Sequence, residues 1–120
     1  MLRAILDHSR DALGVSKRGT HVLVNRAYLD MFGYASAEEL IGTSVVHLIA
    51  PESRDALIAI IEARANGEPA PTDYELIALR KDGTKFEMEV RVSQYELEGE
   101  NYTLVILRDI TERKQAEAAL

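Results

Sequence analysis

The C-terminal part of the chain joins a strand-like apolar run directly to a helix-forming tail. The run is Tyr-Thr-Leu-Val-Ile-Leu at residues 102–107, and the tail is Gln-Ala-Glu-Ala-Ala-Leu at residues 115–120. The tail consists of strong helix formers and contains neither Gly nor Pro. Between the two segments stands Asp-Ile-Thr-Glu-Arg at residues 109–113. A strand that continues at its end into an outgoing helix can transmit strain or rotation to whatever follows it, so we expect this junction to matter for function.

Length and composition set the class of molecule. A chain of 120 residues is expected to form one domain with a single core. The net charge of −6, from 14 basic and 20 acidic residues, argues against binding to nucleic acid, because no basic patch is available to neutralise phosphates. The absence of Cys excludes disulfides, thiolate metal sites and cysteine nucleophiles. No signal peptide is present, and no apolar run approaches the roughly 20 residues that span a membrane, so we expect a cytoplasmic segment without membrane contact.

The first third of the chain predicts a helix, a hairpin and a second helix. Residues 2–9 place their apolar side chains on one helical face. Two short strands follow at 12–16 and 20–24, joined by a turn at Lys-Arg-Gly. A brief helix is then expected between the N-cap residue Asn25 and Gly33, which suits the left-handed position after a helix end.

The rest of the chain predicts a block of helices and then three strands. Residues 36–39 match a capping box for a helix of one to two turns, and 45–49 add a further turn. The longest helical signal covers 52–66, with Leu57, Ile60 and Ile61 as its core face and Ile58 broadening that face. The strands are expected at 73–80, 85–97 and 101–109, separated by the turns Lys-Asp-Gly-Thr and Leu-Glu-Gly-Glu. Strands on both sides of a helical block indicate the α+β class, with an antiparallel sheet that carries the helices on one face.

A set of short motifs resembles those of PAS domains in order and spacing. They are Val-Asn-Arg-Ala at 24–27, Phe-Gly-Tyr at 32–34, Glu-Leu-Ile-Gly at 39–42, Arg-Lys-Asp-Gly-Thr at 80–84 and Asp-Ile-Thr-Glu-Arg at 109–113. The resemblance implies a five-stranded antiparallel sheet in the spatial order 2-1-5-4-3. It also implies a division into an N-terminal helix at 1–10, a PAS core at 11–109 and the start of a signalling helix at 110–120.

Function follows from the same resemblance. It implies a sensory or dimerisation module of a bacterial signalling protein, not an enzyme. Its partners would be a second copy and an output domain further along the same chain, namely a histidine kinase or a cyclic-dinucleotide enzyme. Two alternatives stay open: a constitutive scaffold without a ligand, and an enzyme acting on a small molecule, for which no nucleophile–base pair or metal cluster is apparent.

Neither flavin nor haem is expected as a cofactor. Flavin-binding PAS domains use a Cys, a Trp or a last-strand Gln, whereas this chain has no Cys or Trp and has Leu107 at the position of the Gln. Haem-binding members carry a His on the long helix, and no His follows Ile49 here. The three histidines, at positions 8, 21 and 47, are interpreted as surface or capping residues and are not spaced as a metal site. A small organic ligand remains open.

Such a ligand would lie in an apolar pocket with few polar groups. Asn25, Tyr28 and Tyr74 are the candidate polar groups. The candidate apolar walls come from the helices and from the inward positions of the strands: Phe32, Leu48, Leu57, Ile61, Met88, Val90, Val105 and Leu107. The alternative is that the same side chains fill a packed core and leave no pocket.

Two further sets of residues are expected to act in relay and assembly. Asp109 is predicted to pair with Arg80 or Lys81, or to cap the outgoing helix together with Thr111. Both faces of the last strand are apolar, so the outer face needs a cover. That cover is the N-terminal helix, a second copy, or both, and we predict a parallel homodimer through Leu2, Ile5, Leu6, Leu104 and Ile106.

Overall fold

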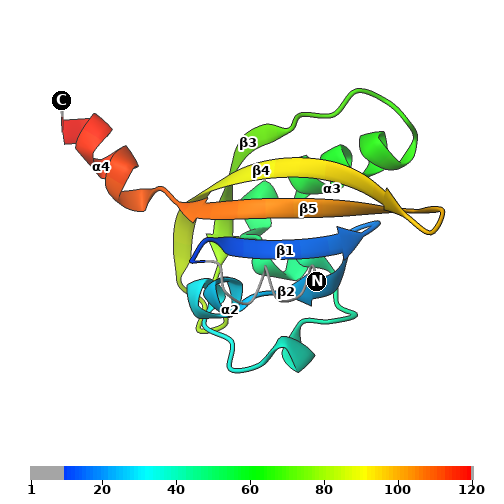
Figure 1. The fold of residues 1–120 in the computed structure, drawn as a ribbon. Helices are drawn as coiled ribbons and strands as arrows, with labels where there is room; N and C mark the ends of the chain where they lie inside the picture. Colours follow the sequence, from blue (N-terminus) through cyan, green and yellow to red (C-terminus); the bar gives the residue numbers. More distant parts are fainter. Residues whose placement is uncertain (1–9, 120) are drawn as a thin grey trace.

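The computed structural model describes residues 10–119 and shows one antiparallel sheet with helices on one face (Figure 1). The elements follow the chain as β1 (Ala12–Lys17), β2 (Thr20–Val24), α2 (Arg26–Phe32), η1 (Ala37–Glu39), η2 (Val45–Leu48), α3 (Pro51–Ala65), β3 (Asp73–Leu79), β4 (Lys85–Leu97), β5 (Glu100–Asp109) and α4 (Thr111–Ala119). The predicted helix at 2–9, with Leu2, Ile5 and Leu6, lies outside the described residues.

The five strands lie in the spatial order β2-β1-β5-β4-β3, which confirms the predicted α+β class and sheet order. The first and last strands of the chain are neighbours at the centre, where Gly14 on β1 is opposite Val105 on β5. β5 continues on its other side along β4, where Val90 is opposite Leu107. β5 therefore has a hydrogen-bonded neighbour on each side, and after its end at Asp109 the chain continues into α4.

The helices form where the local signals predict them, with small shifts at their ends. Asn25 caps α2, and Gly33 follows it with a φ of 80° in the left-handed region. The capping box at 36–39 produces only a single 3-10 turn, because the chain turns at Gly42 and the Gly42 N–H bonds the carbonyl of His21. β3 ends one residue early, since the Arg80 N–H already bonds the carbonyl of Thr84 across the hairpin.

The core lies between the sheet and α2, η2 and α3, where Phe32, Leu48 and Ala78 are almost fully buried. Leu57 is the buried residue of α3, whereas Ile58 is 39% exposed, so the expectation that Ile58 broadens the core face is wrong. Helical spacing separates the two residues by about 100°, and only one side of α3 faces the sheet.

A second apolar cluster lies on the opposite face of the sheet. Leu13 and Val15 on β1 are its buried members. They pack with half-buried side chains of β2, β4 and β5: Val22, Leu23, Tyr95, Tyr102, Leu104 and Ile106. We call these residues the outer-face cluster. The two-sided apolar pattern of the last strand therefore corresponds to two clusters, one on each face.

Candidate functional site

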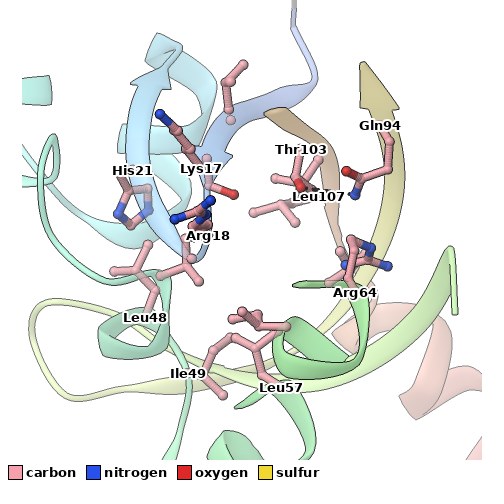
Figure 2. Close-up of a pocket in the computed structure, with 18 of the residues that line it drawn as sticks. Lys17, Arg18, His21, Leu48, Ile49, Leu57, Arg64, Gln94, Thr103 and Leu107 are labelled. Carbon is pink, nitrogen blue, oxygen red and sulfur yellow. Dashed lines mark hydrogen bonds between the residues drawn. The ribbon is translucent and has the colours of Figure 1, made fainter. Parts of the chain in front are cut away.

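A cavity of about 500 Å³ lies between the helices and the sheet. The inward residues of β1, β4 and β5 form its floor, and side chains of α2, η2 and α3 form its walls. In Figure 2, Leu48, Ile49 and Leu57 lie on one side of the hollow and Thr103 and Leu107 on another. A volume of this size is within the range of small-molecule sites, so the core is not completely filled by its own side chains.

The floor of the cavity includes Gly14, which has a steric role. A Cβ atom on Gly14 would lie 2.7 Å from Cε2 of Tyr28, closer than carbon atoms can approach. Glycine at this position lets the ring of Tyr28 lie directly on β1. Tyr28 is 3% exposed, and its ring packs against that of Phe32 with the two centroids 5.1 Å apart.

Nearly all of the predicted pocket residues line this cavity. The residues that the structure brings together there are Tyr28, Phe32, Leu48, Leu57, Ile61, Tyr74, Met88, Val90, Val105 and Leu107. They come together because alternate positions of each strand face the helices.

Asn25 is the exception, and its assignment to the pocket is corrected by the structure. Its Oδ1 accepts hydrogen bonds from the N–H of Leu13 at 2.9 Å and of Tyr28 at 3.0 Å. Its Nδ2 donates to the carbonyl of Asp11 at 2.7 Å. The amide thus caps α2 and joins it to β1 at full burial, outside the cavity lining.

His21 lines the cavity, so its interpretation as a surface or capping residue is wrong. It is 2% exposed and lies between Thr43 and Tyr28. The carbonyl of Thr43 can only accept a hydrogen bond, so Nδ1 of His21 carries the proton and donates to that carbonyl at 3.0 Å. Nε2 of His21 then accepts from the Tyr28 hydroxyl at 2.7 Å. Burial lowers the pKa of His21 and raises the pKa of Tyr28, so both stay neutral at pH 7. Alternation along β2 gives no local signal for this, because the pairing register shifts between Val15 and Ser16 and Leu23 packs in the outer-face cluster.

The mouth of the cavity is polar and was also missed. We use this name for Lys17, Arg18, Arg64, Gln94, Glu100 and Thr103, which line the cavity where the hairpins meet the end of α3. Lys17 pairs with Glu100 at 2.6 Å, and Gln94 donates to the Thr103 hydroxyl at 3.0 Å. Figure 2 shows Lys17 and Arg18 on one side of the opening and Arg64, Gln94 and Thr103 on the other.

The exit junction lies at the opposite end of β5. Oδ2 of Asp109 accepts from Arg80 at 3.3 Å, while its Oδ1 accepts from the N–H of Thr111 at 2.9 Å. Arg80 also donates to the carbonyl of Met31 at the end of α2, and its guanidinium lies 4.3 Å from the ring centroid of Phe86. One arginine thus contacts a helix of the cavity wall, the β3–β4 hairpin and the strand exit.

The other two predicted relay residues have different neighbours. Lys81 pairs with Glu39 on η1 instead of Asp109, and this ion pair holds the pKa of the Glu39 carboxyl below its usual value. The Thr111 hydroxyl accepts from the N–H of Glu87 on β4 at 3.3 Å. The structure therefore places Asp109, Arg80 and Thr111 in one contact network and Lys81 in a neighbouring one.

Ion pairs hold the first turn of α4 against the sheet. Arg113 pairs with Glu75 at 3.1 Å and with Glu89 at 3.3 Å. Lys114 pairs with Glu75 at 2.8 Å, and its hydrogen bond holds the pKa of that carboxyl below the usual range. Beyond this turn α4 projects away from the sheet (Figure 1).

Within residues 10–119 no group of His, Asp and Glu side chains is arranged to hold a metal ion. No described helix is long and apolar enough to cross a membrane.

Comparisons with known proteins agree with this geometry. The family model for the PAS domain matches residues 10–112. The chain is 29% identical over 116 residues to sporulation kinase A of Bacillus subtilis (strain 168), and the match covers 97% of this chain and 19% of the kinase. The chain thus spans about a fifth of that relative's length.

Solved structures show the same fold. The PAS domain of a protein from Colwellia psychrerythraea superposes with a TM-score of 0.75 at 28% identity, covering 92% of this chain and 94% of that one. A LOV protein from Rhodobacter sphaeroides superposes with a TM-score of 0.78 at 22% identity, covering 98% of this chain and 69% of that one. The second similarity concerns the fold alone.

Proposed function

This chain belongs to the PAS domain family, and from that premise we propose that it is a cytoplasmic sensory module of a bacterial signalling protein. The observation that carries the proposal is the cavity of about 500 Å³ between α3 and the sheet. Its inner walls are apolar apart from the hydrogen-bonded pair of His21 and Tyr28, and most of its other polar side chains gather at the mouth, a combination that suits small-molecule sites. A small organic ligand, instead of flavin or haem, would occupy it.

The proposed output lies further along the same chain, beyond α4. The support is the junction at Asp109, where β5 passes into a helix that leaves the sheet, and the similarity to sporulation kinase A. We propose a histidine kinase as the output domain, with a cyclic-dinucleotide enzyme as the alternative. Arg80, Asp109 and Thr111 would relay the state of the cavity to that domain.

A cavity-filling variant tests ligand binding. N-phenylnaphthylamine is a neutral probe whose fluorescence rises in apolar sites. We expect it to bind the wild-type domain with saturation, and we expect Val105→Phe to weaken that binding at least about tenfold, because the added ring would occupy the cavity beside Leu107. A matched control is Ile58→Phe, which adds the same ring to an exposed side of α3.

The result has clear alternatives. Equal binding by the wild type and Val105→Phe, with both proteins folded by circular dichroism, would contradict a ligand site in this cavity. A visible absorption band that survives desalting would instead reveal a bound flavin or haem. Absence of any probe binding would favour a ligand-free scaffold.

An enzyme is the less favoured alternative. Among the described residues, the arrangement that comes closest to an acid–base pair is His21 with Tyr28. The hydroxyl of Tyr28 is committed to His21, and burial shifts the pKa of each group away from pH 7, in opposite directions. Neither group is poised to exchange a proton with a substrate near neutral pH.

We also propose a homodimer through the outer-face cluster. Leu104 and Ile106 belong to this cluster and are half-buried, so a second copy could cover the apolar surface that remains accessible. The variant Leu104→Glu/Ile106→Glu is expected to sediment as a soluble monomer, because paired carboxylates cannot be buried without partners. Ile58→Glu on α3 serves as the control and should remain dimeric. A wild-type domain that is monomeric at high micromolar concentration would rule the dimer out.

A further inference from the structure

Three segments meet at the mouth of the cavity. A Cβ atom on Gly19 would lie 3.3 Å from Cδ1 of Ile61, so the β1–β2 hairpin rests against α3 one turn before Arg64. The ion pair between Lys17 and Glu100, 2.6 Å long, joins the same hairpin to the β4–β5 hairpin. These contacts place Lys17, Arg18 and Arg64 around one opening although they are distant in sequence.

The charge of this opening is opposite to that of the chain. The chain carries a net charge of −6, yet the cavity lining contains three cationic side chains and a single carboxylate, Glu100. Lys17 pairs with that carboxylate. Among the residues that the structure describes, neither Arg18 nor Arg64 forms a direct ion pair. The hydrogen bond from Lys17, with a further attraction from Arg18, holds the pKa of the Glu100 carboxyl below its usual value. Arg64 donates to the carbonyl of Pro71 at 2.7 Å and lies beside the Tyr74 hydroxyl, and neither group neutralises its charge.

The interior of the cavity offers no charged partner. His21 and Tyr28 are neutral, and the remaining deep walls are aliphatic or aromatic: Phe32, Leu48, Leu57, Leu76, Met88, Val90 and Leu107. A charged group placed there would lose its hydration without compensation. A ligand that uses both regions must therefore have an apolar body and a charged group at one end.

We infer that the ligand of this domain is a small organic anion, with its apolar body inside the cavity and its acidic group at the mouth, between Arg18 and Arg64. The inference rests on the proposed sensory function and adds the chemical class of the ligand. Guanidinium groups bind carboxylate, sulfonate and phosphate oxygens in a two-pronged geometry. A cationic opening on an acidic protein also concentrates anions locally.

A matched pair of probes separates this inference from the proposed function. Anilinonaphthalene sulfonate has the aromatic skeleton of N-phenylnaphthylamine plus one anionic group. We expect the wild-type domain to bind the sulfonate about tenfold more tightly than the neutral probe, equivalent to about 1.4 kcal/mol. The preference should fall as ionic strength rises, because the mouth is open to solvent.

The double variant Arg18→Asn/Arg64→Gln removes both guanidinium groups. Asn tolerates the positive φ of 51° at position 18 better than most residues, so the hairpin should be retained. We expect the variant to bind the sulfonate and the neutral probe with equal affinity. The control, Arg91→Gln/Arg108→Gln, changes the net charge equally on strand positions that alternate with Val90 and Leu107, and should keep the preference.

The outcomes are distinct. Equal binding of both probes by the wild type would overturn the anion inference and leave the cavity as a ligand site. A preference that survives in Arg18→Asn/Arg64→Gln would also overturn it, because the attraction would then come from elsewhere. Failure of both probes to bind would reject the ligand site and, with it, the ligand class.

Discussion

Asn25→Ala is expected to lower the free energy of unfolding by about 2–4 kcal/mol. Loss of the N-cap of α2 accounts for about 1 kcal/mol. The larger part comes from the N–H of Leu13, which bonds Asn25 Oδ1 at 2.9 Å and would be left buried without an acceptor. Domains of this kind are stable by only about 5–15 kcal/mol, so the variant should unfold at clearly lower urea concentration.

The N-cap residue of the short helix η2 provides the control for this prediction. Ser44→Ala removes one hydrogen bond, from the Val46 N–H to the Ser44 hydroxyl at 3.2 Å, in a half-buried 3-10 turn. Water can replace that acceptor, so we expect a loss of about 1 kcal/mol or less. The contrary result is that Asn25→Ala lowers the free energy of unfolding no more than Ser44→Ala does, with the same slope of free energy against urea concentration. In that case Asn25 would only cap α2 and would not join it to β1.

Asn25 also shows which features could be predicted from sequence. Its role as an N-cap is local, because the signal lies within one helical turn, and the structure confirms it. Its bonds to Leu13 and Asp11 depend on a tertiary contact across more than ten residues, and no local pattern encodes them. The order of elements was predictable for the same reason as the cap, since Gly33, Gly83 and Gly99 mark turns by positive φ.

The candidate site likewise contains residues that local patterns predicted and residues that depend on tertiary contacts. The strand alternation on β4 and β5 predicted Met88, Val90, Val105 and Leu107 as cavity residues. His21 was missed because its partner Thr43 is 22 residues away. The mouth was missed because Arg18 and Arg64 come together only when the β1–β2 hairpin packs on α3. Periodicity identifies which face is buried, but it does not identify which distant polar groups meet there.

The exit junction connects the cavity to α4 by short steps. Met88 lines the cavity and is the register partner of Asp109 across β4 and β5. On the helical side, Phe32 contacts the cavity, and the carbonyl of its neighbour Met31 accepts from Arg80 at 3.2 Å. Arg80 then donates to Asp109, which accepts from the first N–H of α4. A displacement of α2 by a ligand would therefore act on Arg80 and on the cap of α4 together.

Asp109→Ala is expected to abolish the response of the output domain to ligand in the longer protein that we propose carries this module, while affinity for the ligand changes by less than about twofold. In the isolated domain the lost cap should destabilise the first turn of α4 by about 1 kcal/mol, so the amide of Thr111 should exchange its hydrogen about fivefold faster. Arg108→Ala alters the adjacent exposed residue of β5 and should leave both measurements unchanged.

Because Asp109 lies outside the cavity lining, loss of regulation with intact binding identifies a relay residue, whereas a simple folding defect would weaken both. Normal regulation in Asp109→Ala would show that the state of the cavity reaches α4 by another route, for which the ion pairs of Arg113 and Lys114 with Glu75 are the next contacts to test.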